Sequence, residues 1–385
     1  MPRERDVPYD CPGPSRIRCS RRAAVAALAA AGAGAAGAGA AGAGAAVRLD
    51  AAVPRRGIPL GFDNFAVRGL GWNVRQLVDH AVELRCDSVF VTDFGPFGGR
   101  LDDASLGAVR DYARDRGVAL ALGSWSICPT STSFRREMGT PDEQLAEGVR
   151  MARALGTTAF RVILGSRADR GTPGGIDARI ADTVRVLRAA RGRCLDAGVR
   201  IAVENHAGDM QSRELERLVQ EAGPDFVGVN FDSGNACWTL EDPLVALERL
   251  APHVLTTSLR DTMVWETPDG VTAQWTAMGE GCTDLPAFFD LFARRCPQVV
   301  AHIETISGAQ TRFAIRDPSL WREFPEQRAG ELAAFLALAR KGRPLEPFRP
   351  PAGPDRAAAD RDHQLAELAK SIRHCREQLG LGRRD

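Results

Sequence analysis

Three carboxylates each follow directly on an apolar stretch of the chain. They are Glu204 after Arg200-Ile-Ala-Val, Asp232 after Val227-Gly-Val-Asn-Phe, and Glu304 after Val299-Val-Ala-His-Ile. Desolvating a carboxylate at the end of a buried strand is costly, so such a group needs a cation or a chemical task. Oxygen donors of this kind suit Mn²⁺, Mg²⁺ or another divalent ion. The alternative is an ion pair between each carboxylate and a neighbouring arginine, such as Arg161 or Arg260.

The three stretches belong to a series of eight apolar, β-branched runs that alternate with segments of helical periodicity. This pattern is typical of a parallel sheet covered by helices. The expected strands are 58–65, 88–93, 118–127, 159–166, 200–206, 227–235, 254–261 and 299–306. The expected helices are 73–86, 104–116, one from Thr140 onward, 176–196, 212–222, 242–250, 285–295 and 325–341, the last closing the ring. A long loop, 262–284, is expected between the seventh strand and its helix.

Eight such units predict an α/β chain with a (β/α)8 TIM barrel as its catalytic domain, over residues 57–342. All loops that follow the strands of such a barrel open on one face. We therefore expect the three carboxylates to meet at the carboxyl ends of the strands.

The first 46 residues form a separate segment. Arg21 and Arg22 precede an Ala/Gly-rich stretch, 23–46, with few larger apolar residues. This pattern predicts a twin-arginine export signal, recognised by the export machinery, with the mature protein in the periplasm or elsewhere outside the cytoplasm. The alternative is a flexible Ala/Gly spacer on a cytoplasmic protein. The stretch is too weakly hydrophobic to be our first choice for a membrane span.

Charge and cysteine content exclude several classes of protein. Fifty Lys and Arg balance 49 Asp and Glu, which leaves a net charge of +1 and no strong basic field for nucleic acid. Nine cysteines are an odd number without CxxC or zinc-finger spacing. Neither a disulfide framework nor a structural zinc site is indicated.

The chain continues beyond the barrel, over residues 343–385. Residues 343–354 are rich in proline, and 357–379 read as one charged amphipathic helix. This helix packs either on the barrel or on a second subunit, so a homo-oligomer through it is one expectation.

Five segments, in this order, carry a family resemblance. They are Ala202-Val-Glu-Asn-His206, Asn230-Phe-Asp-Ser-Gly-Asn235, Ser258-Leu-Arg-Asp261, Gly279-Glu-Gly281 and His302-Ile-Glu-Thr305. Together they resemble the sugar phosphate isomerase/epimerase family, the xylose isomerase-like TIM barrels, from about residue 58 to 341.

The resemblance implies a metal site. In that family a Glu, an Asp, a His and a Glu at the ends of strands five to eight bind one divalent ion. They correspond here to Glu204, Asp232, position 258 and Glu304. Position 258 is Ser. A hydroxyl is a poor substitute for imidazole, so metal affinity should fall unless another group completes the shell.

The implied reaction moves a proton next to a carbonyl group of a sugar or polyol-like substrate, such as a keto-sugar. The metal would polarise the carbonyl and stabilise an enediolate. Glu204 and Glu304 would act as base and acid, and Asp232 would anchor the ion.

Five further residues are expected to contact substrate: Trp125, His206, Asn235, Arg260 and Glu280. Each also has a structural explanation. Asn235 could be a turn residue, Arg260 could form an internal ion pair, and Glu280 could belong to a tight loop. Trp125 could cap the barrel and His206 could be a structural imidazole, whereas His302, one layer below the strand end, is expected in the core.

Two other functions remain open. The first is an exported, non-catalytic sugar-binding barrel with a degraded metal site, which Ser258 favours. The second is a metal-dependent lyase or hydrolase on the same scaffold. Nucleases of this fold need a His-rich multi-metal site and a basic face, and six His with near-zero net charge disfavour them.

Overall fold

The structure is a computed structural model that describes residues 55–384. The expected export signal, within residues 1–46, lies outside the described residues. Of the helices in the described range, none is long and apolar enough to cross a membrane.

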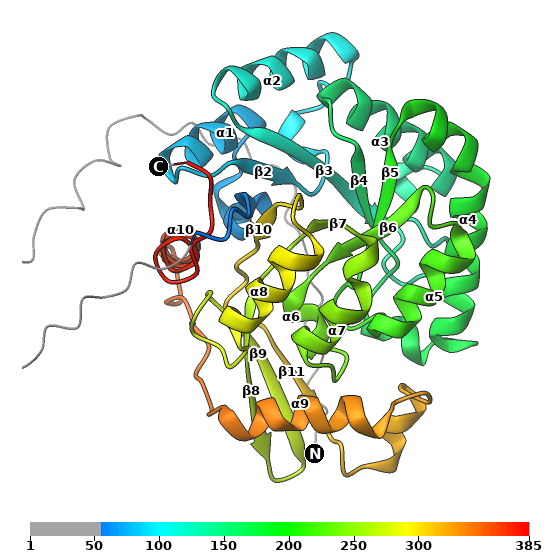
Figure 1. The fold of residues 1–385 in the computed structure, drawn as a ribbon, viewed down its shortest axis with the longest axis vertical. Coiled ribbons are helices and arrows are strands. Elements are labelled where there is room, and N and C mark those ends of the chain that lie inside the picture. The colour runs from blue at the N-terminus through cyan, green and yellow to red at the C-terminus, as the bar shows by residue number, and fades with distance from the viewer. Residues whose placement is uncertain (1–54, 385) are drawn as a thin grey trace, which may run out of the picture. The chain divides into compact units, whose positions relative to one another are not determined.

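Eight parallel strands form the predicted barrel (Figure 1). Their order in the sheet is β10 (Ala301–Ile303), β1 (Leu60–Asp63), β2 (Ser88–Val91), β3 (Ala119–Ser126), β4 (Ala159–Ile163), β5 (Arg200–Glu204), β6 (Val227–Phe231) and β7 (Val254–Thr257). The residues after β7 close the ring, because Leu259 N donates to His302 O at 2.7 Å and Glu304 N donates to Leu259 O at 2.9 Å. The fold class predicted from the sequence is confirmed.

Helices surround this sheet in the expected alternation. They are α1 (Val74–Glu83), α2 (Asp103–Asp115), α3 (Pro141–Leu155), α4 (Gly175–Ala197), α5 (Ser212–Ala222), α7 (Pro243–Leu250) and α8 (Leu285–Arg295). The predicted start of α3 is confirmed, since Thr140 and Glu143 form a reciprocal capping box with Pro141 in the first turn. A short helix, α6 (Ser233–Cys237), replaces the expected end of strand six because the Asp232 carboxylate caps its first turn.

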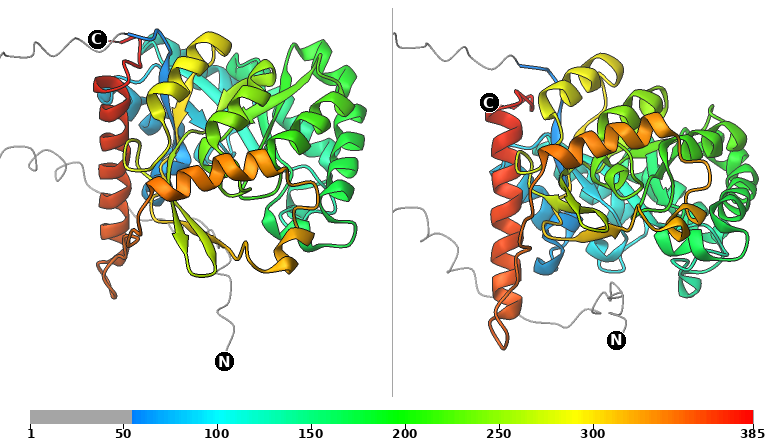
Figure 2. Two further views of the ribbon diagram at one scale, coloured as in Figure 1. Left: turned by 60° about the horizontal axis from the view of Figure 1, so that its bottom comes forward. Right: turned by 90° about the horizontal axis from the view of Figure 1, so that it is seen from below.

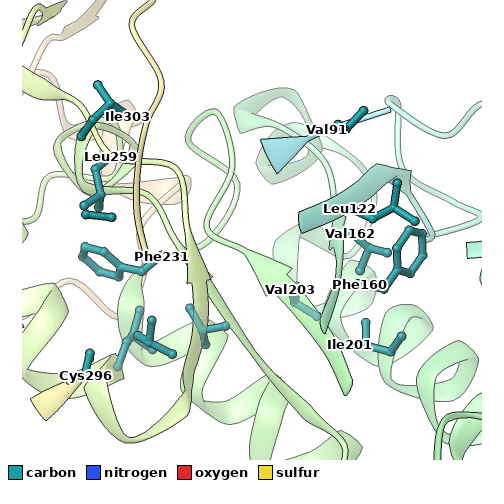
Figure 3. Close-up of a cluster of buried hydrophobic side chains, with 14 of the residues drawn as sticks. Val91, Leu122, Phe160, Val162, Ile201, Val203, Phe231, Leu259, Cys296 and Ile303 are labelled. Carbon is teal, nitrogen blue, oxygen red and sulfur yellow. The ribbon is translucent and has the colours of Figure 1, made fainter. Parts of the chain in front are cut away.

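The alternation of side chains along each strand separates two environments. Ile201 and Val203 of β5 belong to the apolar layer between sheet and helices, together with Phe160 and Val162 of β4 (Figure 3). Because strand side chains alternate in direction, Glu204 points into the barrel instead. The same parity carries the polar residues at the other strand ends into the barrel interior. All seven cysteines in the described part of the chain are free, and most are buried.

A second, antiparallel sheet lies beside the barrel, where the sequence had predicted only a long loop from 262 to 284. It consists of β8 (Asp261–Thr267), β9 (Gly270–Thr276) and β11 (Gln310–Phe313), in the order β11-β9-β8. The loop prediction was wrong because residues 261–267 and 270–276 pair as a hairpin across Pro268 and Asp269.

The two C-terminal helices also differ from expectation. Helix α9 (Ala329–Lys341) was predicted to close the ring, but it packs against β8, with Phe335 buried beside Phe313. Helix α10 (Arg356–Glu377) contacts β1, β10 and the 3-10 segment η1 (Asn64–Leu70) instead (Figure 2). Its apolar face joins the main core. The helix after the Pro-rich linker therefore covers the seam between the first and last barrel strands.

Candidate active site

Four carboxylates gather inside the barrel at the carboxyl ends of its strands. They are Asp63 after β1, Glu204 on β5, Asp232 after β6 and Glu304 after β10, and all have relative exposures of 6% or less. Glu204, Asp232 and Glu304 were predicted to lie here. Hydrogen bonds to shared donors link their carboxylates into one cluster.

Glu204 is held by an arginine and two amides. Arg161 Nε donates to Glu204 Oε2 at 2.6 Å, and Asn230 Nδ2 donates to the same oxygen at 2.7 Å. Among residues 55–384, Oε1 has only a long contact of 3.4 Å from Asn235 Nδ2. Glu204 is thus fixed in position with one oxygen weakly engaged.

Arg260 lies between the other two expected metal ligands. Its Nη2 donates to both Asp232 Oδ2 and Glu304 Oε2. The guanidinium carbon lies 4.1 Å from the centroid of the Trp275 ring, which stacks on Trp238 at 4.0 Å and 14°. Arg260, expected to bind substrate or to form an internal pair, forms ion pairs within the cluster and occupies its centre.

The turn after β6 positions Asp232. Its Oδ1 accepts from Gly234 N at 2.8 Å and from Asn235 N at 2.9 Å, while Asn235 Nδ2 donates to Oδ2 at 2.7 Å. The Asn205 side chain holds the Asp232 backbone with two hydrogen bonds. Asn205 Nδ2 donates to Asp232 O at 2.8 Å, and Asp232 N donates to Asn205 Oδ1 at 2.9 Å. Asn235, predicted near the site, therefore links Asp232 to Glu204.

Ser258 stands where the resemblance placed a histidine ligand. Its Oγ donates to Asp63 Oδ2 at 3.1 Å and accepts from Asn230 Nδ2 at 3.2 Å. Through these two hydrogen bonds the Ser258 hydroxyl connects Asp63, after β1, to Asn230 of β6 within the carboxylate cluster.

The pKa values of the four carboxyl groups shift in different directions. Burial would raise the pKa of Glu204, but Arg161 and other neighbouring cations outweigh burial and lower it. Burial raises the pKa of Asp232 to about 8; Arg260 opposes this rise, and the nearby Glu204 and Glu304 reinforce it. The pKa of Glu304 is raised by burial and by Glu204, against Arg260, and that of Asp63 is raised by burial and by Glu304. Glu204 is thereby favoured as a carboxylate and the others as acids.

The remaining predicted residues lie at different places. His206 is half-buried, with Nδ1 2.7 Å from Gly165 O. Desolvation lowers the pKa of its imidazole, and the nearby Glu204 opposes this shift. The Trp125 ring is covered by the Arg135 guanidinium at 3.7 Å. Glu280 forms an ion pair with Lys370 of α10 at 2.8 Å and is half exposed. No contact of Trp125 or Glu280 with the cluster is found among the described residues.

A divalent ion does not fit this donor set as it is arranged. Arg161 and Arg260 already engage the three expected carboxylate ligands, and Ser258 hydrogen-bonds Asp63. Within residues 55–384, no three His, Cys, Asp or Glu side chains are grouped so as to hold a metal ion. The expectation drawn from the resemblance is therefore not met by these residues: a guanidinium lies where the carboxylates would share the ion.

Sequence reasoning missed Asp63 and Asn230. A signal for Asp63 was present, because Leu60-Gly-Phe-Asp63 also ends an apolar run in a carboxylate. Asn230 precedes Asp232 by two positions and shares its side of the strand, so the alternation along β6 could have identified it.

A cavity of about 620 Å³ is lined in part by Trp275, the residue whose ring contacts Arg260. Its walls come from the hairpin sheet, the segment after β10, the Pro-rich linker and α10, and they include Trp275, Thr276, Glu280, Ser307, Arg343 and His363. Glu280 thus borders this cavity rather than the carboxylate cluster.

Comparisons with known proteins agree with the fold. The chain is 29% identical over 213 residues to the uncharacterized protein YihM of Escherichia coli (strain K12), covering 54% of this chain and 59% of that protein. It is 25% identical over 168 residues to an inosose dehydratase of Geobacillus kaustophilus (strain HTA426), covering 40% and 53%. The chain thus spans less than two thirds of either relative's length.

Among solved structures, an L-ribulose 3-epimerase matches with a TM-score of 0.50 and 14% identity, over 85% of this chain and all of that one. Residues 78–339 match the xylose isomerase-like TIM barrel family. That match covers well over half of the chain, and the protein therefore belongs to the xylose isomerase-like TIM barrel family.

Proposed function

We propose that this protein is a sugar-modifying enzyme that moves a proton next to the carbonyl group of a small polyhydroxylated substrate. The fold, together with an epimerase and a dehydratase among the similar proteins, supports an enzyme of this broad class. The observation that carries the proposal is the presence of Glu204 and Glu304 in one buried carboxylate cluster, where Arg161 binds the first and Arg260 binds the second.

The charges assign the roles. Arg161 keeps Glu204 ionised, and its weakly engaged Oε1 is free to accept a proton from carbon. Burial raises the pKa of Glu304, against Arg260, so Glu304 is the better proton donor of the two. Two carboxyl groups whose surroundings push their pKa values apart form a natural base and acid.

The proposed reaction needs only proton transfers between the substrate and the two carboxyl groups, without an added oxidant or reductant. Glu204 takes the proton from the carbon beside the carbonyl, the C–H electron pair becomes the C=C bond of an enediolate, and the C=O π pair moves onto the oxygen. For isomerisation, Glu304 gives a proton to the former carbonyl carbon, and the hydroxyl proton of the first carbon passes to the neighbouring oxygen as the new C=O bond forms. Return of a proton to the opposite face of the same carbon gives epimerisation; in dehydration the hydroxyl of the next carbon takes a proton from Glu304 and leaves as water while the C=O bond re-forms. No step is routed through a metal ion, because the donor set does not fit one.

Deuterium uptake from solvent tests this proposal. The purified protein would be incubated in D₂O with a panel of ketoses, aldoses and inositol-derived ketones, with and without Mn²⁺ or Mg²⁺, and followed by NMR. We expect deuterium at a carbon beside a carbonyl of at least one compound. Glu204→Gln should slow the exchange by about 100- to 10,000-fold, the usual contribution of a general base.

Glu266→Gln is the matched control, because Glu266 is an exposed carboxylate on β8, remote from the cluster. It should exchange at the wild-type rate. Exchange at the same rate in wild type and Glu204→Gln, or no exchange with any compound, would refute the proposal.

A second function is a non-catalytic, exported sugar-binding barrel. The observation that favours it is the engagement of Glu204, Asp232 and Glu304 by arginines, which leaves the family's expected metal site altered. Saturable sugar binding by calorimetry, without exchange of any carbon-bound proton, would support this function over catalysis.

A further inference from the structure

We infer that Arg260 takes the place of the divalent ion in this barrel and binds the substrate's carbonyl oxygen through one of its two unpaired donors, Nε or Nη1. The inference rests on the proposed function and adds a residue and a binding mode to it. It also explains why the family's carboxylate ligands occur here beside Ser258.

The first support is a buried cation with unused donors. Arg260 is 2% exposed, and only its Nη2 meets carboxylate oxygens. Nε and Nη1 are buried and have no hydrogen-bond partner among the described residues. Buried charged donors without partners are costly and uncommon, and a ligand that accepts from them removes that cost.

Neighbouring side chains extend this set of unpaired atoms. Asn230 Oδ1, Asn235 Oδ1 and Trp275 Nε1 are also buried without partners. Asn235 contacts Asp232, an ion-pair partner of Arg260, and Trp275 lies against the guanidinium. These unpaired atoms match a ligand that has a carbonyl oxygen beside hydroxyl groups. The carbonyl oxygen would accept from the Arg260 guanidinium, and the hydroxyls would donate to the amide oxygens of Asn230 and Asn235.

The guanidinium is held in place before any ligand arrives. Arg260 N donates to Ser233 Oγ at 3.0 Å, and Ser233 Oγ donates back to Arg260 O at 2.6 Å. The stacked rings of Trp275 and Trp238 close one side of the guanidinium. A donor fixed in a site with little water stabilises developing negative charge without having to reorganise.

This arrangement gives Arg260 the electrostatic part of an ion's role. When Glu204 removes the proton, negative charge collects on the former carbonyl oxygen, and the guanidinium can stabilise it through a charge-assisted hydrogen bond from an unpaired N–H group. Asp232 and Glu304 then orient Arg260 as they would have oriented a bound cation.

Binding of Mn²⁺ alone tests the first half of the inference without any sugar. The metal-stripped full chain would be titrated with Mn²⁺ and followed by electron paramagnetic resonance. We expect no saturable site in wild type. The double variant Ser258→His/Arg260→Ala should acquire one site per chain, because it restores the imidazole and removes the guanidinium.

One tightly bound Mn²⁺ per wild-type chain would overturn the inference. So would a folded double variant, verified by circular dichroism, that fails to gain a site. The wild-type titration needs no variant and decides the question even if the double variant does not fold.

Chemical rescue tests the second half. Arg260→Ala should lower deuterium exchange by about 100-fold or more, the usual effect of removing an oxyanion donor. Added guanidinium chloride should restore part of the rate. Arg260→Lys should remain slow, since lysine keeps the charge but its single ammonium group cannot bind both carboxylates and also present a separate, fixed N–H group to the substrate. Wild-type exchange should be unchanged in EDTA.

Loss of wild-type exchange in EDTA, or full exchange by Arg260→Ala, would refute the role of Arg260. If wild type exchanges no proton with any compound, the proposed function fails instead. The Mn²⁺ titration still decides whether Arg260 occupies the ion's place.

Discussion

A Cβ atom on Gly234 would lie only 2.3 Å from Cγ of Arg260 and 2.6 Å from its Cδ. The stem of Arg260 therefore crosses the first turn of α6 at the one point where a side chain is missing. Contacts below 3.0 Å force something to move, so the guanidinium reaches Asp232 and Glu304 in this conformation only because residue 234 is glycine.

Gly234→Ala should displace Arg260 from its two carboxylates. Overpacking of this kind usually costs about 1 to 3 kcal/mol of unfolding free energy. The variant should melt at a lower temperature and lose near-ultraviolet circular dichroism from the stacked Trp238 and Trp275, because Arg260 packs on that pair.

Gly192→Ala is the matched control, since Gly192 lies inside α4 and a Cβ there meets nothing within 4 Å. It should leave the dichroism unchanged and stabilise the chain by about 0.5 to 1 kcal/mol, the usual gain of Ala over Gly in a helix. Equal melting temperatures for Gly234→Ala and wild type would contradict the tight contact with Arg260.

His302 should make stability depend on pH. Ser88 Oγ donates to Ala119 O at 3.1 Å, so His302 Nε2 donates to Ser88 Oγ at 2.9 Å and the buried Nδ1 has no described partner. Burial lowers the pKa of His302 from 6.5 to about 3. Its confinement to the core was predicted and is confirmed.

Between these two pKa values the unfolded chain binds a proton that the folded chain does not. Stability from this residue is therefore complete above pH 6.5 and falls as pH drops toward 3, by at most about 1.4 kcal/mol per pH unit. Urea unfolding at pH 7, 6 and 5 would measure this slope. His302→Gln should flatten it, whereas His253→Gln, outside the barrel interior, should not. Identical slopes in wild type and His302→Gln would contradict the prediction.

The barrel and the location of its carboxylates were predictable because they depend on local patterns. An apolar run that ends in Glu204 or Glu304 indicates both a strand and a charge at its end, and β/α alternation brings such ends to one face. The partner of each carboxylate was not predictable. Spacing does not show whether Arg260 points toward Asp232 or away from it, since that depends on packing against Gly234 and Trp275.

The position of the last two helices shows the same limit. Both α9 and α10 carry apolar residues, and their sequences contain no signal for which one covers the seam between β10 and β1. The hairpin sheet decides this, because its apolar face needs a cover and α9 follows it closely along the chain. A prediction that missed the hairpin could only assign the barrel seam to α9.

The N-terminal arginines should control export, as the twin-arginine pattern of Arg21 and Arg22 suggests. Replacing both with lysine keeps the charge but removes the recognised pair. In a bacterial host with this export pathway, the wild-type chain should be found outside the cytoplasm in a shortened form. The double lysine variant should stay inside at full length. Equal distribution of the two proteins would favour the flexible-spacer alternative.

Helix α10 should contribute to the stability of the barrel, because Leu368, Ile372 and Cys375 of this helix lie in the barrel's main hydrophobic core. Leu368 is fully buried. Leu368→Ala should therefore lower the free energy of unfolding by about 2 to 5 kcal/mol, the cost of a cavity in a packed core. Leu195→Ala is the matched control, because Leu195 is 44% exposed on α4 and such surface changes usually stay within about 0.5 kcal/mol. Urea unfolding measures both, and equal values would mean that α10 docks without contributing to the stability of the core.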